Sequence, residues 1–437
     1  MSWVTDSVLA RRPWLANPGL FSYGFTEAND DEGAASAGRS TQVAKRLAEA
    51  YRRAVADDPR RDGPSDMWTE IKAGFQQELA RLAAAAARDA APRAPAPVPG
   101  AVPGTGAVPP RVVPPGVVPP GAADELAAYL RRLPRQAAGH GFLQGQASFN
   151  HLVAHPEEQY QRALWLMDHL VGMAEWAGVL DVRCPEQGGY AAVPAGASAG
   201  ELREEIEAKT GLVLGLPAVF EGLFVLEPRA RPVHLRALSA AYALWEAASF
   251  ARQYLGTEIS RLRVAEIGAG MGYTAFVAHQ LGVAEHVIYD LPEVNLAQGY
   301  FLLMVLPPSA VSLYGEAPVG PAGAPHVWVL PSFMAYEAAH GPFDVTVNVD
   351  SLPEIAPQVA SRYLAHFGEA SRLFLSINQE ARAPQTAAQR QSVVRELAGA
   401  AGLRPLLRYP NWLRPGYVDE LWACGPWAAA GRTGERS

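Results

Sequence analysis

The stretch LRVAEIGAGMGYTAFVAHQLG, residues 262–282, decides the fold of this chain. It begins with mostly apolar residues, continues with three glycines at alternate positions and ends in an apolar pattern at helical spacing. This order predicts a buried strand, a tight turn and a helix. Gly268, Gly270 and Gly272 let the backbone turn sharply and let a ligand approach main-chain N–H groups that a Cβ atom would shield. The sequence therefore predicts a ligand-binding loop at the carboxyl end of a strand.

The residues of this loop favour one class of cofactor. A dinucleotide-binding loop reads G-x-G-x-x-G, whereas Tyr273 stands at the third glycine position and the chain reads E-x-G-x-G-x-G from Glu266. The next predicted strand leads to Asp290, where a carboxylate can accept hydrogen bonds from both ribose hydroxyls of an adenosine. Together these features predict S-adenosyl-L-methionine (SAM) as cofactor, with Glu266 accepting a hydrogen bond from its ammonium group or ribose. Taken singly, a glycine turn is often only a tight connection, and such an aspartate is often a helix cap.

The part of the chain after residue 260 has the rhythm of a parallel sheet. Short runs rich in Val and Ile alternate with helical segments, which is typical of a doubly wound α/β fold. The predicted fold class is α/β, with a Rossmann-like seven-stranded sheet whose last two strands form an antiparallel edge pair. The strands are predicted over residues 262–267, 286–289, 326–330, 343–349, 372–377, 405–409 and 420–424.

The residues before the sheet follow helical spacing. Helices are predicted over residues 41–56, 158–179 and 233–254, so we expect an all-helical N-terminal part with a proline-rich insertion. The insertion, residues 92–120, is almost only Ala, Pro, Val and Gly, which is typical of flexible chain. The predicted organisation is an N-terminal helical region (1–91), a flexible linker (92–123), a helical acceptor-binding or dimerisation region (124–258) and a SAM-binding domain (259–430).

Bulk composition excludes several classes of protein. At 437 residues the chain exceeds what one hydrophobic core usually holds. No apolar run approaches the roughly 20 residues of a membrane span, and the N-terminus lacks the apolar core of a secretory signal. We therefore expect a cytoplasmic protein with no membrane partner. A formal net charge of −7 gives no reason to expect nucleic acid. The two cysteines, Cys184 and Cys424, lie far apart, and no metal is expected.

Polar residues follow two of the predicted strands and are candidates for the site. Ser332, after the third strand, would lie near the adenine edge. After the fourth strand, Asp350 and Glu354 are the predicted acceptor-side carboxylates, one of which would act as general base, and Asn348 would orient substrate or cofactor. An alternative for Glu354 is a capping box with Ser351, in which its carboxylate returns to a backbone amide.

For the other candidate residues, a structural role is expected rather than a role in catalysis or binding. His326 and His340 lie near the predicted rim and could act as the base, but a structural role is expected for each. Trp165, Trp176 and Trp245 are expected in the core of the helical part rather than against a substrate.

The glycine loop, Asp290 and the strand rhythm resemble the large class of Rossmann-like methyltransferases that use SAM. Further segments are similar to the sugar O-methyltransferase family of bacterial saccharide and natural-product pathways. This resemblance implies methyl transfer to a hydroxyl of a sugar or glycosylated natural product, with a helical part that supplies the acceptor pocket or a homodimer contact. The chain departs from the family in the 92–120 insertion and at Ile355, where a methionine is usual. The segments are AKRLAEAYRRA (44–54), MWTEI (67–71), LGLPAVFEG (214–222), FDVTVNVDSLPEI (343–355) and LFLSINQEA (373–381).

Three alternatives stay open at the level of sequence. An N-methyltransferase acting on a small amine would use the same loop and carboxylates. A scaffold that binds SAM without turnover would keep Glu266, the glycine loop and Asp290. A nicotinamide-dependent oxidoreductase is disfavoured by Tyr273.

Overall fold

The computed structural model describes residues 6, 8–9, 12, 15, 21–27, 33–58, 73–81, 122–182, 186, 198–337, 340–380 and 392–425. The proline-rich segment 92–120 and Cys184 lie outside these described residues. No helix in the described ranges is long and apolar enough to cross a membrane. The same ranges contain no group of three or more His, Cys, Asp or Glu side chains that could hold a metal ion.

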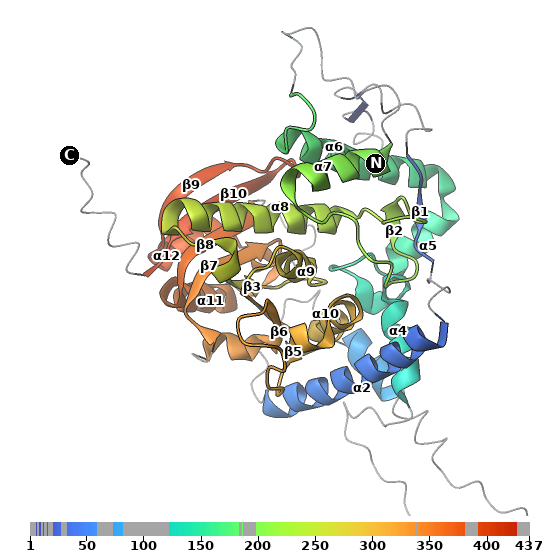
Figure 1. Ribbon diagram of the computed structural model, residues 1–437, viewed down its shortest axis with the longest axis horizontal. Helices are drawn as coiled ribbons and strands as arrows, with labels where there is room; N and C mark the ends of the chain where they lie inside the picture. Colours follow the sequence, from blue (N-terminus) through green and yellow to red (C-terminus); the bar gives the residue numbers. More distant parts are fainter. Residues whose placement is uncertain are drawn as a thin grey trace, which may run out of the picture.

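A mixed eight-stranded sheet forms the centre of the molecule (Figure 1). Its strands are β3 (Arg263–Ile267), β4 (Glu285–Asp290), β5 (Val311–Leu313), β6 (His326–Pro331), β7 (Phe343–Val349), β8 (Ser371–Gln379), β9 (Arg404–Pro410) and β10 (Tyr417–Ala423). They lie in the order β5-β6-β4-β3-β7-β8-β10-β9, and β10 runs antiparallel to both of its neighbours while the others are parallel. The chain passes from β3 to β4, continues to the edge strand β5, returns to β6 and then crosses to β7. The switch of direction between β3 and β7 opens a crevice at their carboxyl ends, where such sheets bind ligands.

The eighth strand corrects the predicted count of seven. Strands occur at all seven predicted positions, and β5 is added at the edge of the sheet beside β6. It has three residues and follows directly on a short 3-10 helix, Pro308–Ala310. A strand this short shows no periodicity that a sequence pattern can detect.

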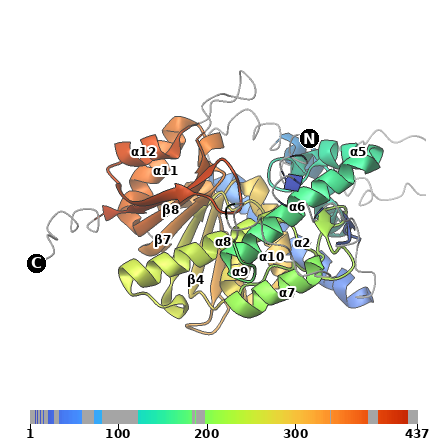
Figure 2. The same ribbon diagram turned by 90° about the horizontal axis from the view of Figure 1, so that it is seen from above.

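Helices cover both faces of the sheet, as Figure 2 shows. Val264 of β3 belongs to a large apolar cluster that includes helices α8 (Leu235–Phe250), α9 (Tyr273–Gln280) and α10 (Pro292–Val305). Ala265 and Ile267, whose side chains point to the other face of β3, belong to a second cluster with helices α11 (Pro357–Ala370) and α12 (Val394–Ala400). Because successive strand residues point to opposite faces, a sheet covered on both sides needs the nearly continuous apolar run seen in the sequence.

The part of the chain before the sheet is not all-helical, in contrast to the prediction. Two short strands, β1 (Tyr23–Phe25) and β2 (Phe224–Leu226), pair in an antiparallel ladder. The rings of Phe25 and Phe224 meet edge to face across it, with centroids 5.5 Å apart. Strands of three residues from distant segments leave no local pattern, so the prediction could not find them. Residues 73–81 are also helical, and the other helices are α2 (Gly33–Asp57), α4 (Ala123–Arg131), α5 (Gln146–Ala154), α6 (Pro156–Trp176) and α7 (Ala199–Thr210).

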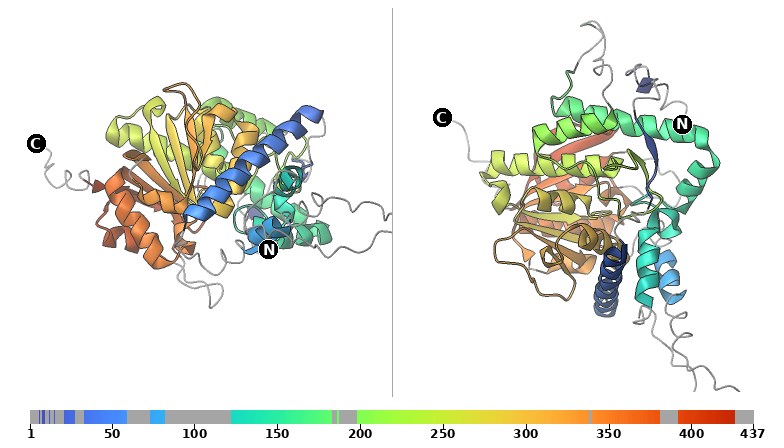
Figure 3. Two further views of the ribbon diagram at one scale, coloured as in Figure 1. Left: turned by 90° about the horizontal axis from the view of Figure 1, so that it is seen from below. Right: turned by 45° about the vertical axis from the view of Figure 1, so that its right-hand side comes forward.

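Helix α2 packs against α10, which also contacts the edge strand β5 (Figure 3). A Cβ atom at Gly299 would overlap the side chain of Leu47, so glycine at this position lets the two helices approach closely. Arg39 Nη2 donates hydrogen bonds to Leu303 O (2.8 Å) and Leu306 O (2.9 Å). These carbonyls belong to the end of α10, where backbone acceptors lack helical partners. The helix α2 therefore both covers and caps α10.

Candidate active site

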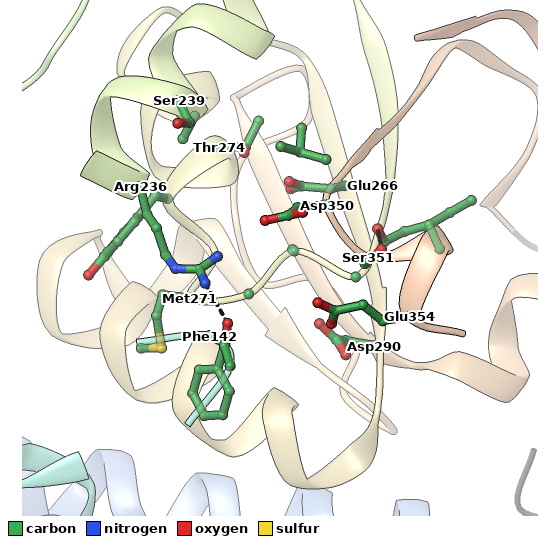
Figure 4. A pocket seen from close by; sticks show the side chains of 18 of the residues that line it. Phe142, Arg236, Ser239, Glu266, Met271, Thr274, Asp290, Asp350, Ser351 and Glu354 are labelled. Atoms are coloured by element: carbon green, nitrogen blue, oxygen red, sulfur yellow. Dashed lines mark hydrogen bonds between the residues drawn. The ribbon is translucent and has the colours of Figure 1, made fainter. Parts of the chain in front are cut away.

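The carboxyl ends of the central strands open into a cavity of about 280 Å³. In Figure 4 the side chains of Glu266, Asp290, Asp350 and Glu354 lie on one side, and Arg236 reaches in from the opposite side. Seven of the nine predicted site residues line this cavity, namely Glu266, Gly268, Gly270, Asp290, Ser332, Asp350 and Glu354. Gly272 and Asn348 do not line it.

The glycine loop has a backbone that side chains would strain. The φ angles of Gly268, Gly270 and Gly272 are +69°, +57° and +77°, in the left-handed region that favours glycine. Gly272 is the N-cap of α9, and a Cβ there would lie 3.2 Å from the Leu302 side chain on α10. Its role is therefore to pack the turn against α10, while Gly268 and Gly270 face the cavity.

Glu266 is a buried carboxylate at the base of the cavity. Its side chain comes from β3, is 2% exposed and lies with Oε2 2.8 Å from His286 Nε2 on the adjacent strand β4. A buried carboxylate requires such a partner because removal from water is costly. The contact with His286 holds the Glu266 side chain in position beside the glycine loop.

Asp290 is held at the end of β4 by two donors. Its Oδ1 accepts a hydrogen bond from Leu291 N (2.7 Å), and its Oδ2 accepts one from Gln298 Nε2 (2.6 Å). Burial, and to a smaller extent the nearby Glu266 carboxylate, outweigh the opposing effect of the hydrogen bonds and raise the pKa of Asp290 to about 7. A pKa in this range gives the ligand-free site a carboxyl group that changes its charge near neutral pH.

Ser332 and Asn348 take different positions. Ser332 directly follows β6 and lines the cavity. Asn348 is fully buried at the end of β7, where its Nδ2 donates to Ile267 O at 2.8 Å and its Oδ1 accepts from Asn378 Nδ2 at 3.0 Å. Its side chain joins three strand ends, so it can act on the cavity only by holding the loop that follows it.

Asp350 adopts a left-handed backbone with a φ of +65°, a conformation that aspartate tolerates better than most residues. Its Oδ2 accepts hydrogen bonds from Nη1 and Nη2 of Arg414, both at 3.1 Å, and its Oδ1 accepts one from the Tyr417 hydroxyl at 2.7 Å. The Arg414 guanidinium also lies over the Tyr417 ring, 3.6 Å from its centroid. Both oxygens of Asp350 are thus engaged, and the carboxylate fixes Arg414 at the wall of the cavity.

Glu354 faces the cavity rather than forming the predicted alternative, a capping box. It ends the short 3-10 helix Leu352–Glu354, which Ser351 precedes without any side-chain capping hydrogen bond. The Ser351 hydroxyl instead donates to Ile267 O at 2.9 Å. Glu354 lines the cavity.

Comparisons with known proteins give only partial likenesses. No protein-family model and no curated protein sequence matches this chain. Mitomycin 7-O-methyltransferase MmcR is 17% identical, with a TM-score of 0.29 over 43% of this chain and 57% of its own. Magnesium protoporphyrin IX methyltransferase from Synechocystis, solved with bound SAM, is 13% identical, with a TM-score of 0.29 over 42% of this chain and 83% of its own. LepI in complex with SAM is 14% identical, with a TM-score of 0.27 over 38% of this chain and 43% of its own.

Several residues of the cavity were not predicted as site residues. Arg162 and Trp165 of α6, Arg236 of α8 and Arg414 of the loop between β9 and β10 all line it. Trp165, which was expected in the core, carries the Arg162 guanidinium 4.2 Å above its ring centroid. None of these residues belongs to a local motif, because their elements meet only in the folded chain.

The structure places neither histidine candidate at the cavity. His326 begins β6 and so lies at the end of the strand opposite to the cavity, and neither it nor His340 lines the cavity. His234 does line it. Burial, aided by Arg236 and Arg162, lowers the pKa of His234 to about 3. Its Nδ1 accepts a hydrogen bond from Arg236 N at 3.3 Å, which requires that nitrogen to be unprotonated.

Proposed function

We propose that this chain binds SAM and transfers its methyl group to a hydroxyl of a small-molecule acceptor. One observation carries the proposal. Glu266, Gly268, Gly270 and Asp290 line one cavity together with Asp350 and Glu354. A cofactor half and an acceptor half thus share one space, as a direct group transfer requires.

The residues of the cofactor half fit the chemistry of SAM. The Asp290 carboxylate would accept hydrogen bonds from the ribose hydroxyls, and Ser332 lies where the adenine edge would be. Gly268 and Gly270 leave room for the methionine part, whose ammonium group the Glu266 carboxylate would attract. When bound, SAM supplies a methyl group activated by a sulfonium.

The acceptor half supplies a base and a positioning group. In our proposal Glu354 takes the proton of the acceptor hydroxyl as the oxygen forms its bond to the methyl carbon and the carbon–sulfur bond breaks. Asp350 is a positioning residue, because its oxygens are occupied by Arg414 and Tyr417. In-line transfer depends mainly on such positioning, which can contribute roughly 7 kcal/mol or more.

The proposal also covers the acceptor, the role of the helical region and the localisation. The acceptor is a sugar or glycosylated natural product, the helical region 124–258 shapes its pocket or forms a homodimer contact, and the protein is cytoplasmic. The resemblance of short segments to sugar O-methyltransferases supports this choice. Screening hydroxylated sugars with radiolabelled SAM, and measuring the mass in solution, tests these points.

Titration calorimetry tests the cofactor. Micromolar binding of SAM and S-adenosylhomocysteine (SAH), with no binding of NAD, is expected. Binding of NAD, or of none of the three, would contradict the proposed function.

Replacing Asp290 with alanine should weaken SAH binding by roughly 1 to 3 kcal/mol, the scale of hydrogen bonds to a charged group. The ionised carboxylate is the better acceptor, so wild-type affinity should rise between about pH 6 and 8, through the pKa of about 7. Asp290→Asn should remove this dependence. If SAH affinity depends on pH in Asp290→Asn as it does in the wild type, a group other than Asp290 is responsible for the pH dependence.

Titration of Asp290 should also change the stability of the fold. Ligand affinity is expected to rise with pH, whereas the contribution of Asp290 to folding stability should fall. Its folded-state pKa is raised from 3.8 to about 7, so it favours folding fully below pH 4, and this contribution is lost as the pH rises to 7. Asp290→Asn should therefore be at least as stable as the wild type at pH 8 in urea unfolding. A destabilised variant would mean that the ionised carboxylate is needed for folding.

A further inference from the structure

Two arginines of the cavity lack a carboxylate partner among the described residues. Arg414 is paired with Asp350. Arg236, in the first turn of α8, donates its hydrogen bond to the backbone oxygen of Gly141. Arg162, on α6, stacks on Trp165. Guanidinium groups withdrawn from water normally have an anionic partner, because an uncompensated buried charge is costly.

Two hydroxyl groups of the same cavity lack partners as well. The Tyr273 hydroxyl and the Ser239 hydroxyl are buried and have no hydrogen-bond partner among the described residues. Tyr273 is 3% exposed. Ser239 lies three residues after Arg236 on α8, a spacing that places both on one face of the helix. Buried hydroxyls without partners are rare in proteins, and here they indicate a ligand that accepts hydrogen bonds.

The charges around the two arginines support this interpretation. Burial, together with the nearby Arg236, lowers the pKa of Arg162 to about 10. Burial also lowers the pKa of Arg236, with Asp350 and Glu354 opposing that effect. The two cations therefore destabilise each other, and a bound anion would relieve the repulsion. Because the charged neighbours of Arg236 are Asp350, Arg414 and Glu354, it belongs to the acceptor half of the cavity.

We propose that the methyl acceptor is an acid, whose carboxylate or other anionic group is bound by Arg162 and Arg236 and accepts hydrogen bonds from Ser239 and Tyr273. The planar fork of each guanidinium can bind two oxygens of such a group. The Trp165 ring beside Arg162 provides an apolar surface for the carbon skeleton next to the acid. This inference rests on the proposed function, because it names the substrate class of that site.

The direct test uses inorganic sulfate as probe on the SAH complex. Calorimetric titration at constant ionic strength should show saturable sulfate binding to the wild type and a loss of about tenfold or more in Arg162→Gln and Arg236→Gln. The matched control is Arg252→Gln, which removes an exposed arginine paired with Glu258 on the surface. Absence of sulfate binding to the wild-type SAH complex, or equal affinity in all variants, would overturn the inference.

A second measurement separates the acceptor from the carboxylate of the cofactor itself. SAH carries an amino-acid group that methylthioadenosine lacks. Equal SAH affinity in the wild type, Arg162→Gln and Arg236→Gln is expected, whereas selective loss of SAH but not methylthioadenosine affinity would assign the arginines to the cofactor. Failure of the wild type to bind SAH would instead refute the proposed function. Circular dichroism and thermal unfolding of each variant establish that it is folded.

Acceptor screening gives the final readout. Candidate acids should be compared with their carboxamides, and the acid should be methylated about tenfold faster or more in the wild type. Arg162→Gln should lose this preference. Equal turnover of acid and carboxamide by the wild type would overturn the inference while leaving the methyltransferase activity established.

Discussion

Glu354→Gln should lower kcat by roughly 10²- to 10⁴-fold, the usual contribution of a general base, while leaving SAH affinity unchanged. The variant keeps the shape of the side chain and removes its ability to take a proton from an acceptor hydroxyl. Glu354 is the expected base because it lines the cavity, whereas both oxygens of Asp350 accept hydrogen bonds from Arg414 and Tyr417. The measurement is methyl transfer to the best acceptor of the screen, over a range of pH.

Asp350→Asn is the matched comparison for this experiment. It should act mainly on KM, because it weakens the ion pair that holds Arg414 and leaves Glu354 in place. A small effect of Glu354→Gln together with a large loss of kcat in Asp350→Asn would show that Asp350 is the base and Glu354 the positioning residue. A small effect of both would favour an amine acceptor, since an amine that is already neutral needs less help from a base.

Gly268→Ala should destabilise the protein by about 2 to 5 kcal/mol and abolish measurable SAH binding. A Cβ atom at this position would overlap the Ser351 side chain, and the φ of +69° is unfavourable for any L side chain. The overlap and the unfavourable φ both lower stability. Binding is lost as well, because relieving the overlap would move the turn that faces the cavity. Urea unfolding and calorimetry measure the two outcomes.

Gly282→Ala separates the backbone effect from the overlap. Gly282 has a similar φ of +77°, and a Cβ there would have no atom within 4 Å. It should therefore cost only about 1 to 2 kcal/mol. Ser351→Gly, combined with Gly268→Ala, should restore part of the lost stability. Equal losses in the two alanine variants would show that contact with Ser351 contributes nothing.

The residues of the proposed cofactor half could be placed at one cavity from the sequence because they are close in sequence. Glu266 and the glycines occupy one strand and turn, and Asp290 ends the next strand. Each feature follows from short-range rules of backbone conformation and strand order. Asn348 shows the limit of such rules, since the end of a strand was predicted but not the direction of its side chain.

In the proposed acceptor half, the carboxylates Asp350 and Glu354 were predicted, but the arginines could not be, because distant elements bring them together. Arg162 lies on α6, Arg236 on α8 and Arg414 between β9 and β10, and only the tertiary fold brings them to one cavity. In the sequence these arginines resemble ordinary polar positions on helices and loops. Tyr273 was interpreted only as the absence of a glycine, whereas its buried hydroxyl lines the cavity.

The packing of α2 on α10 has a consequence for synthesis on the ribosome. The Tyr51 hydroxyl of α2 lies 3.4 Å from Glu293 of α10, a contact between residues 242 positions apart. At typical translation rates that separation corresponds to about 12 to 50 s. During this interval the face of α2 that α10 will cover has emerged while its partner has not yet been made. The nascent chain is thus an expected client of chaperones that bind exposed apolar helices.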